Sequence, residues 1–154
     1  MNDVKIISGA QTGVDRGALD AALEVGVSCG GWCPKGRRAE DGRIPDKYPV
    51  IELSDSRYRQ RTLHNVLHSD ATLIIYFSIL EGGTELTVLY CMQHAKPYKL
   101  IDAQEIPSEQ AVRMLQEFVS DQGVKILNVA GPRASHQPKA HRYTFDVLLG
   151  FFLL

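Results

Sequence analysis

The segment ISGAQTGVDRGALDAAL, from Ile7 to Leu23, predicts how the chain begins to fold. Residues 4–8, VKIIS, have the pattern of a buried strand, and residues 16–25 have the pattern of a helix. Gly9 and Gly13 lie between them and allow the backbone to turn sharply. The segment therefore predicts a strand, a tight glycine-rich loop and a helix in immediate succession.

The same alternation continues to the end of the chain. Short apolar runs predict further strands at 29–33, 49–53, 71–77, 98–102 and 124–130. Amphipathic stretches predict further helices at 56–70, 84–94, 108–123 and 138–154, with Ser108 as a capping residue. Continuously apolar strands that alternate with helices are typical of a parallel sheet covered on both faces. We therefore expect one α/β domain over 1–154, with a Rossmann-like, doubly wound and mostly parallel sheet.

The composition excludes several classes of protein. Of the 154 residues, 44% are apolar and 23% charged, as in globular domains and unlike disordered chains. The formal net charge of −1 argues against a protein that coats nucleic acid, which would be far more basic. The longest apolar run, VLLGFFLL, is shorter than the roughly 20 residues of a membrane span. The three cysteines fit no zinc spacing and the first residues do not resemble a signal peptide, so we expect reduced thiols, no metal ligands and a cytoplasmic location.

Four predicted loops are rich in glycine and in groups that bind anions. They are GAQTGVDRG (9–17), PKGRRAEDGRIP (34–45), SILEGGTE (78–85) and AGPRASHQPK (130–139). Ligands of open parallel sheets bind beyond the carboxyl ends of the strands, where we expect all four loops to meet. The first loop matches neither GxGxxG nor the Walker lysine loop, so neither a dinucleotide nor ATP is indicated. Together the loops predict a site for a small anionic ligand.

The residue types in these loops suit an anion. Gln11 and Thr12 offer side-chain hydrogen bonds, and the helix that opens near Arg16 would present free N–H groups. Gly82 and Gly83 would expose backbone amides, and arginine pairs with phosphate through its planar guanidinium. The other polar candidates are Lys35, Arg37, Arg38, Thr84, Arg133 and Ser135. Each loop taken alone also fits a structural interpretation: a glycine-lined turn, a helix cap or a solvated basic surface.

Several residues outside the glycine motifs allow two interpretations. Trp32 could stack on a planar ligand or pack at the rim of the core, and Cys33 could meet a metal centre or be an inert buried thiol. His64 and His68 are four residues apart on a predicted helix and fit a surface pair. Acidic residues are common at helix starts because of the helix dipole, but three could serve in acid–base chemistry. These are Asp15, Glu81 and Glu85.

Four segments resemble a known family over nearly the whole chain: SGAQTGVDRGALDAAL, GGWCPKGRRAEDGRIP, LEGGTELT and ILNVAGPRAS. They are similar to the signature segments of molybdenum cofactor carrier proteins, which are related to the lysine-decarboxylase-like phosphoribohydrolases. The resemblance implies a Rossmann-like fold whose pocket binds a molybdopterin-type ligand rather than turning it over. The pocket residues that it implies are Gly9, Gln11, Thr12, Gly13, Arg16, Lys35, Arg38, Gly82, Gly83, Thr84, Arg133 and Ser135. The chain departs from the family at Ala10, where glycine is usual, and at Ala134, where glutamate is usual.

These observations leave alternative functions open. The first is binding, protection and delivery of the molybdenum cofactor, with molybdoenzymes or the cofactor insertion machinery as partners. The second is a phosphoribohydrolase-like enzyme that cleaves nucleoside monophosphates, with Glu85 as the catalytic carboxylate and Arg16 holding the phosphate. A nucleotide-sensing module is a third. Because the terminal FDVLLGFFLL is apolar around much of a helix and needs burial, we also expect a homo-oligomer, either a dimer or a tetramer.

Overall fold

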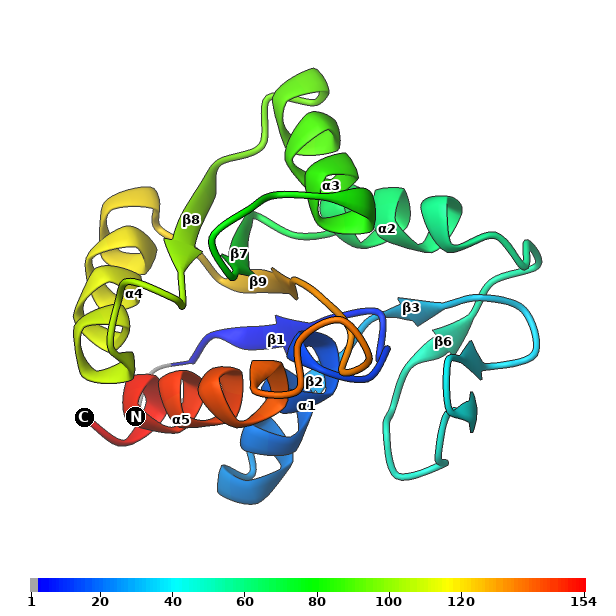
Figure 1. The fold of residues 1–154 in the computed structure, drawn as a ribbon, viewed down its shortest axis with the longest axis horizontal. Helices are drawn as coiled ribbons and strands as arrows, with labels where there is room; N and C mark the ends of the chain where they lie inside the picture. The colour runs from blue at the N-terminus through cyan, green and yellow to red at the C-terminus, as the bar shows by residue number, and fades with distance from the viewer. Residues whose placement is uncertain (1–2) are drawn as a thin grey trace.

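A parallel β-sheet forms the centre of the computed structural model, which describes residues 3–154 (Figure 1). Its five strands lie in the order β2-β1-β9-β7-β8 and all pair in parallel. Their bounds are β1 Lys5–Ile7, β2 Cys29–Gly30, β7 Ala71–Tyr76, β8 Tyr98–Asp102 and β9 Ile126–Ala130. The register places Ile6 beside Cys29 and Leu127, so the N-terminal strand lies near the middle of the sheet. The predicted α/β fold with a parallel sheet is confirmed.

Helices cover both faces of this sheet (Figure 1). On one face lie α1 (Val14–Val25), α4 (Ser108–Gln122) and α5 (Ala140–Leu153), and on the other α2 (Tyr58–Leu67) and α3 (Gly82–Gln93). Helix α3 begins two residues earlier than predicted and includes the glycine pair in its first turn. The residue that caps α4 is Pro107, so the prediction of Ser108 as its cap is wrong. Within residues 3–154, no helix is long and apolar enough to cross a membrane.

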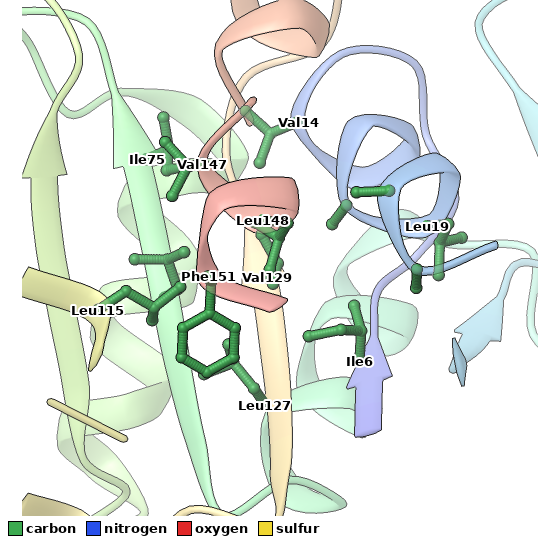
Figure 2. Close-up of a cluster of buried hydrophobic side chains, with 14 of the residues drawn as sticks. Ile6, Val14, Leu19, Ile75, Leu115, Leu127, Val129, Val147, Leu148 and Phe151 are labelled. Atoms are coloured by element: carbon green, nitrogen blue, oxygen red, sulfur yellow. The ribbon is translucent and has the colours of Figure 1, made fainter. Parts of the chain in front are cut away.

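The core lies between the sheet and the helices α1, α4 and α5 (Figure 2). Residues 71–75 of β7 are fully buried, as its continuously apolar sequence predicts. On α5, the side chains of Val147, Leu148, Phe151 and Phe152 are also buried, each at a gain of roughly 1.5–3 kcal/mol. The prediction of an oligomer assumed that the apolar side chains of this helix need a second subunit to bury them. In the structure, the core of one chain buries them. Among the apolar side chains of the helix, Leu153 at its end is largely exposed.

The predicted strand 29–33 is divided by Gly31. This residue has a φ of 122°, and a Cβ atom there would lie 2.1 Å from the carbonyl oxygen of Ser8. The chain therefore leaves the central sheet after β2, and β3 (Trp32–Cys33) pairs with β6 (Ile51–Glu52) in a separate two-stranded sheet. The strands β4 (Arg38–Ala39) and β5 (Gly42–Arg43) form a hairpin between them. The prediction that loop 34–45 follows a strand of the main sheet is wrong.

Candidate ligand-binding cavity

A cavity of about 400 Å³ opens at the carboxyl ends of β1, β9 and β7. Gly9 follows β1, Phe77 follows β7 and Gly131 follows β9, and all three line the cavity. The chain leaves β1 toward one edge of the sheet and β7 toward the other, so the cavity lies where the strand order reverses. Its volume falls within the 300–1,000 Å³ range of small-molecule sites. Helices α2 and α3 and the loops 9–17 and 130–139 supply the remaining walls.

The side chain of Gln11, which lines this cavity, carries a buried donor without a partner in residues 3–154. Its Oε1 atom accepts hydrogen bonds from the N–H groups of Thr12 (3.1 Å) and Glu40 (2.9 Å). Those two bonds fix the orientation of the amide, whose Nε2 atom is buried and has no partner among the described residues. Gln11 is only 5% exposed and lines the cavity. A buried donor without an acceptor costs about 1–3 kcal/mol, which an acceptor atom of a ligand would recover.

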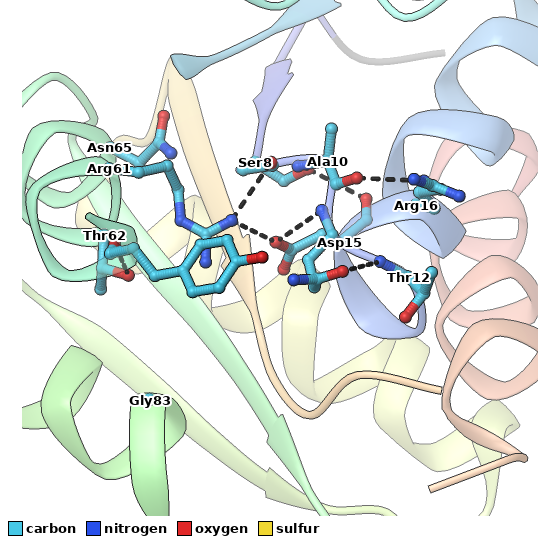
Figure 3. Close-up of polar contacts among 12 residues, drawn as sticks. Ser8, Ala10, Thr12, Asp15, Arg16, Arg61, Thr62, Asn65 and Gly83 are labelled. Carbon is cyan, nitrogen blue, oxygen red and sulfur yellow. Dashed lines mark hydrogen bonds and ion pairs between the residues drawn. The ribbon is translucent and has the colours of Figure 1, made fainter. Parts of the chain in front are cut away.

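An arginine outside the four predicted loops, Arg61 of α2, lines the cavity beside Asp15 (Figure 3). Its Nη1 atom donates to the carbonyl oxygen of Gly9 (3.2 Å) and lies 3.5 Å from Oδ2 of Asp15. A Cβ atom on Gly9 would lie 2.1 Å from the same nitrogen. Gly9 was expected to let a ligand approach the backbone, and in the structure it makes room for Arg61.

The carboxyl group of Asp15 is buried beside Arg61 and lines the same cavity. Burial raises its pKa to about 6, although the positive charge of Arg61 and a hydrogen bond from the N–H of Gln11 both favour the ionised form. That N–H lies 3.3 Å from Oδ2 of Asp15. Because this pKa is close to neutral pH, the carboxyl group can either accept or donate a hydrogen bond or a proton within the cavity.

The start of α1 is capped by the chain itself. The N–H of Val14 donates to the carbonyl oxygen of Pro132 (3.2 Å), and those of Gln11 and Thr12 bind side chains of the same loop. A Cβ atom on Gly13 would lie 2.4 Å from that carbonyl oxygen of Pro132, so loop 130–139 packs directly against the loop that begins α1. The N–H groups of Gln11, Thr12 and Val14, and that of Arg16, which donates to the carbonyl oxygen of Gln11 (3.1 Å), are therefore not free for an anion.

Two other candidates from the first loop hold loops together. The Thr12 hydroxyl donates to Oε2 of Glu40 (2.8 Å) and accepts from the N–H of Ala134 (3.1 Å). Arg16 forms a two-point ion pair with Asp41, at 2.5 and 2.8 Å, and its Nε donates to the carbonyl oxygen of Ala10. Neither Thr12 nor Arg16 lines the cavity. Their contacts fix the hairpin β4–β5 against the loop that carries Gln11.

The first turn of α3 does offer free amides to the cavity. Gly82, Gly83 and Thr84 all line it. The N–H groups of Thr84 and Glu85 donate to the carbonyl oxygen of Glu81, whereas those of Gly82 and Gly83 have no acceptor within residues 3–154. Two unpaired N–H groups at the positive end of a helix bind anions well. Glu85, the carboxylate of the hydrolase hypothesis, is exposed and does not line the cavity.

The basic loop is not part of the cavity wall. Lys35 and Arg38 are exposed and do not line the cavity, and Arg37 binds four carbonyl oxygens, those of Ile44, Pro45, Tyr48 and Val50. In loop 130–139, Arg133 lines the cavity, but Ser135 instead donates its N–H to Glu40 (3.3 Å). Of the four loops expected to meet, three contribute lining residues.

Helix α2 replaces the basic loop as a wall of the cavity. Its residues Arg61, Thr62 and Asn65 line the cavity from successive turns (Figure 3). The i, i+1 and i+4 spacing of these polar residues is the pattern that could have identified this face in the sequence. Asn65 also holds the backbone of Trp32 through two hydrogen bonds of 3.0 Å.

The ring of Trp32 packs beside α2. Its centroid lies 4.9 Å from that of His64 and 4.7 Å from that of His68, and Trp32 does not line the cavity. The packing interpretation therefore holds for Trp32. Cys33 is a free, buried thiol whose pKa is raised by burial, in agreement with the inert interpretation.

Comparison with known proteins identifies the family of the chain. A family model described as the circularly permutated YpsA SLOG family matches residues 6–152. The curated proteins give no match. Among solved structures, the chain is similar to the "Putative molybdenum carrier protein" of Syntrophus aciditrophicus SB, with 45% identity, coverage of 99% of this chain and 96% of that chain, and a TM-score of 0.94. This similarity confirms the resemblance predicted from the four segments, and the chain belongs to the circularly permutated YpsA SLOG family.

Proposed function

We propose that this protein binds, protects and delivers a molybdopterin-type cofactor. The observation that carries the proposal is a single cavity that combines free backbone amides with a buried, unpaired side-chain donor. The amides of Gly82 and Gly83, with Arg61 and Arg133, suit a phosphate group. Gln11 and Asp15 suit the polar edge of a pterin. The name of the similar solved structure, a molybdenum carrier, supports the same class of ligand.

The cargo would bring its own metal ligands. A molybdopterin holds molybdenum through its dithiolene sulfur atoms, so the protein needs to supply hydrogen bonds and charge rather than metal-binding side chains. The cavity provides these, and its walls would shield the bound face of a ligand from water. For delivery, we propose a molybdoenzyme or its cofactor insertion machinery as the receiving partner.

Retention of free cofactor tests this proposal. The purified protein is mixed with cofactor under anaerobic conditions, separated by gel filtration, and assayed for bound pterin and for the cofactor that can still activate an apo-molybdoenzyme. We expect retention and slower loss of transferable cofactor, with affinity reduced about tenfold or more in Gln11→Leu. Gln110→Leu, an exposed change on α4, is the matched control. A wild-type protein that neither retains nor protects the cofactor would refute the carrier function.

A second candidate function is supported by Asp15. A carboxyl group with a pKa of about 6 beside Arg61 could assist cleavage of an N-glycosidic bond, a role that Glu85 and Arg16 cannot fill from outside the cavity. The test is incubation with nucleoside monophosphates, followed by chromatography for the free base. If the wild type releases free base and Asp15→Asn does not, the protein is an enzyme. If the wild type releases no base, this second function is refuted and a binding function remains.

We also propose that the protein assembles as a dimer or tetramer. The burial of α5 no longer requires this, but the outer side of α3 leaves Leu89 and Met92 45% and 61% exposed. Apolar side chains grouped on one helix favour association. Light scattering at micromolar concentration distinguishes an oligomer from a monomer, and a monomer would overturn the proposal.

A further inference from the structure

Three arginines from separate segments surround one aromatic ring, that of Tyr58 at the start of α2. The Cζ atom of Arg38 lies 4.6 Å from the ring centroid, and those of Arg61 and Arg133 each lie 5.4 Å from it. Guanidinium groups at these distances are attracted to the face of a tyrosine ring. Arg61 and Arg133 also line the cavity, so the ring of Tyr58 lies at its margin.

The chain holds this cluster in place while leaving most of its donors free. Arg38 donates from Nη2 to the carbonyl oxygen of Ser56, and Arg61 donates from Nη1 to that of Gly9. The guanidinium of Arg133 makes no hydrogen bond or ion pair among the described residues. Each guanidinium has five N–H donors, so the cluster keeps many that a phosphoryl group could accept from.

Few negative charges balance the cluster. Arg61 has Asp15 beside it, and Glu40 lies close enough to Arg133 to feel its charge. Arg38 has no carboxylate partner within residues 3–154. The three arginines carry more positive charge than these two carboxylates balance, and an anionic ligand would reduce the repulsion among them.

The local sequence also opposes the helix dipole. The positive N-terminal end of α2 has no acidic residue in its first turn, and the segment SRYRQR (56–61) places three arginines there. One of them, Arg57, is neutralised by Asp55 at 2.7 Å, but Arg61 faces the cavity. Departures from local stability rules of this kind are found at functional sites.

We propose that Tyr58 is a positioning residue that gathers Arg38, Arg61 and Arg133 into one phosphoryl-binding cluster. Through Arg38, the basic loop 34–45 then contributes to ligand binding although it does not line the cavity. We expect the aromatic ring of Tyr58 to be required for gathering the arginines and its hydroxyl group not to be required. This inference deepens the proposed function by assigning the anionic end of the ligand to this wall, and it applies to any ligand that carries a phosphoryl group.

Equilibrium dialysis with radiolabelled inorganic phosphate tests the cluster without the cofactor. We expect the dissociation constant to rise about tenfold or more in Tyr58→Leu and in Arg38→Ala, and to change less than about threefold in Tyr58→Phe, which keeps the ring. Arg59→Ala, an exposed arginine of the same helix, is the matched control and should bind as the wild type does. Binding should also weaken as the salt concentration rises.

The double variant Tyr58→Leu/Arg38→Ala separates positioning from simple charge loss. If the ring acts through the arginines, the dissociation constant of the double variant should equal that of the single variant that binds phosphate less tightly. If the two residues act independently, the fold-changes of the two single variants should multiply in the double variant. Thermal unfolding shows whether Tyr58→Leu folds. If Tyr58→Leu does not fold, Arg38→Ala still tests the cluster, because its side chain is exposed and its loss should not unfold the protein.

The possible results decide the two proposals separately. Unchanged phosphate binding in Arg38→Ala, multiplied effects in the double variant, or equal losses in Tyr58→Phe and Tyr58→Leu would each overturn the inference. Failure to retain the molybdenum cofactor, with the expected phosphate pattern intact, would overturn the proposed function alone.

Discussion

The buried carboxyl group of Asp15 predicts how the stability of this protein depends on pH. Burial is the largest influence on the group and raises its pKa from 3.8 to about 6. Around pH 5, the folded protein therefore holds a proton on Asp15 that the unfolded chain has already released. Between about pH 4 and pH 6, the contribution of Asp15 to the free energy of unfolding decreases as the pH rises, and above this range it stays low.

The size of the effect follows from the two pKa values. They differ by about 2, and each pKa unit corresponds to about 1.4 kcal/mol, so the full change is about 3 kcal/mol. The side chain of Asp15 is only 10% exposed, so solvent screening reduces this value little. Asp15→Asn keeps the shape and one acceptor oxygen but cannot ionise. Its stability relative to the wild type should therefore increase by about 3 kcal/mol between about pH 4 and pH 8.

Urea unfolding of both proteins across this pH range measures the difference directly. Comparing the variant with the wild type at each pH cancels the titration of every other group. Glu24→Gln, which removes an exposed carboxylate from the same helix, should follow the wild type within about 0.5 kcal/mol. If the profiles of Asp15→Asn and the wild type run parallel, Asp15 does not titrate as its buried position requires.

Three further predictions concern the fold. Gly31→Ala should lower the free energy of unfolding by about 3 kcal/mol or more, because its Cβ would lie 2.1 Å from the carbonyl oxygen of Ser8. Gly26→Ala, with open space around it, should lower it by about 1 kcal/mol, and denaturant unfolding measures both. Phe151→Ala should cost about 3–5 kcal/mol in the same assay, and Leu154→Ala, which is 86% exposed, less than about 0.5 kcal/mol. The fluorescence of Trp32, the only tryptophan, should be quenched as the adjacent imidazoles gain protons. Because burial and the nearby His68 lower the pKa of His64, we expect an acidic phase of this quenching below pH 6.5 that is absent in His64→Gln.

Much of the fold could be predicted because its signals are local. The apolar run of β7 and the alternation with helices were sufficient for a parallel sheet, and therefore for the meeting of loops 9–17, 78–85 and 130–139. The division at Gly31 depends instead on contact with the backbone of Ser8, 23 residues earlier in the chain. Its neighbour Gly30 looks equivalent in the sequence, and only tertiary structure distinguishes them.

The site was less predictable because polar side chains have many candidate partners. Arg16 and Thr12 were expected to bind a ligand, but Asp41 and Glu40, which lie 25 and 28 residues further along the chain, occupy them instead. Arg61 was missed for the opposite reason. A polar face on a helix is typical of exposure to solvent, and nothing in the local pattern shows that this face of α2 turns toward a cavity.

The relation between Gly9 and Arg61 connects these two results. A glycine at the end of β1 leaves space beside the strand, and the sequence cannot say which group fills it. In this protein the guanidinium of Arg61 fills that space. A side chain at position 9 would therefore displace Arg61, which lines the cavity, rather than a ligand. Arg61 in turn contacts the ring of Tyr58, which also holds Arg38 and Arg133. The glycine-rich loop contacts the basic loop directly through Thr12 and Arg16, and α2 adds a second connection, from Gly9 through Arg61 and Tyr58 to Arg38. A change at Gly9 should therefore alter phosphate binding through the arginines rather than through the backbone of the loop.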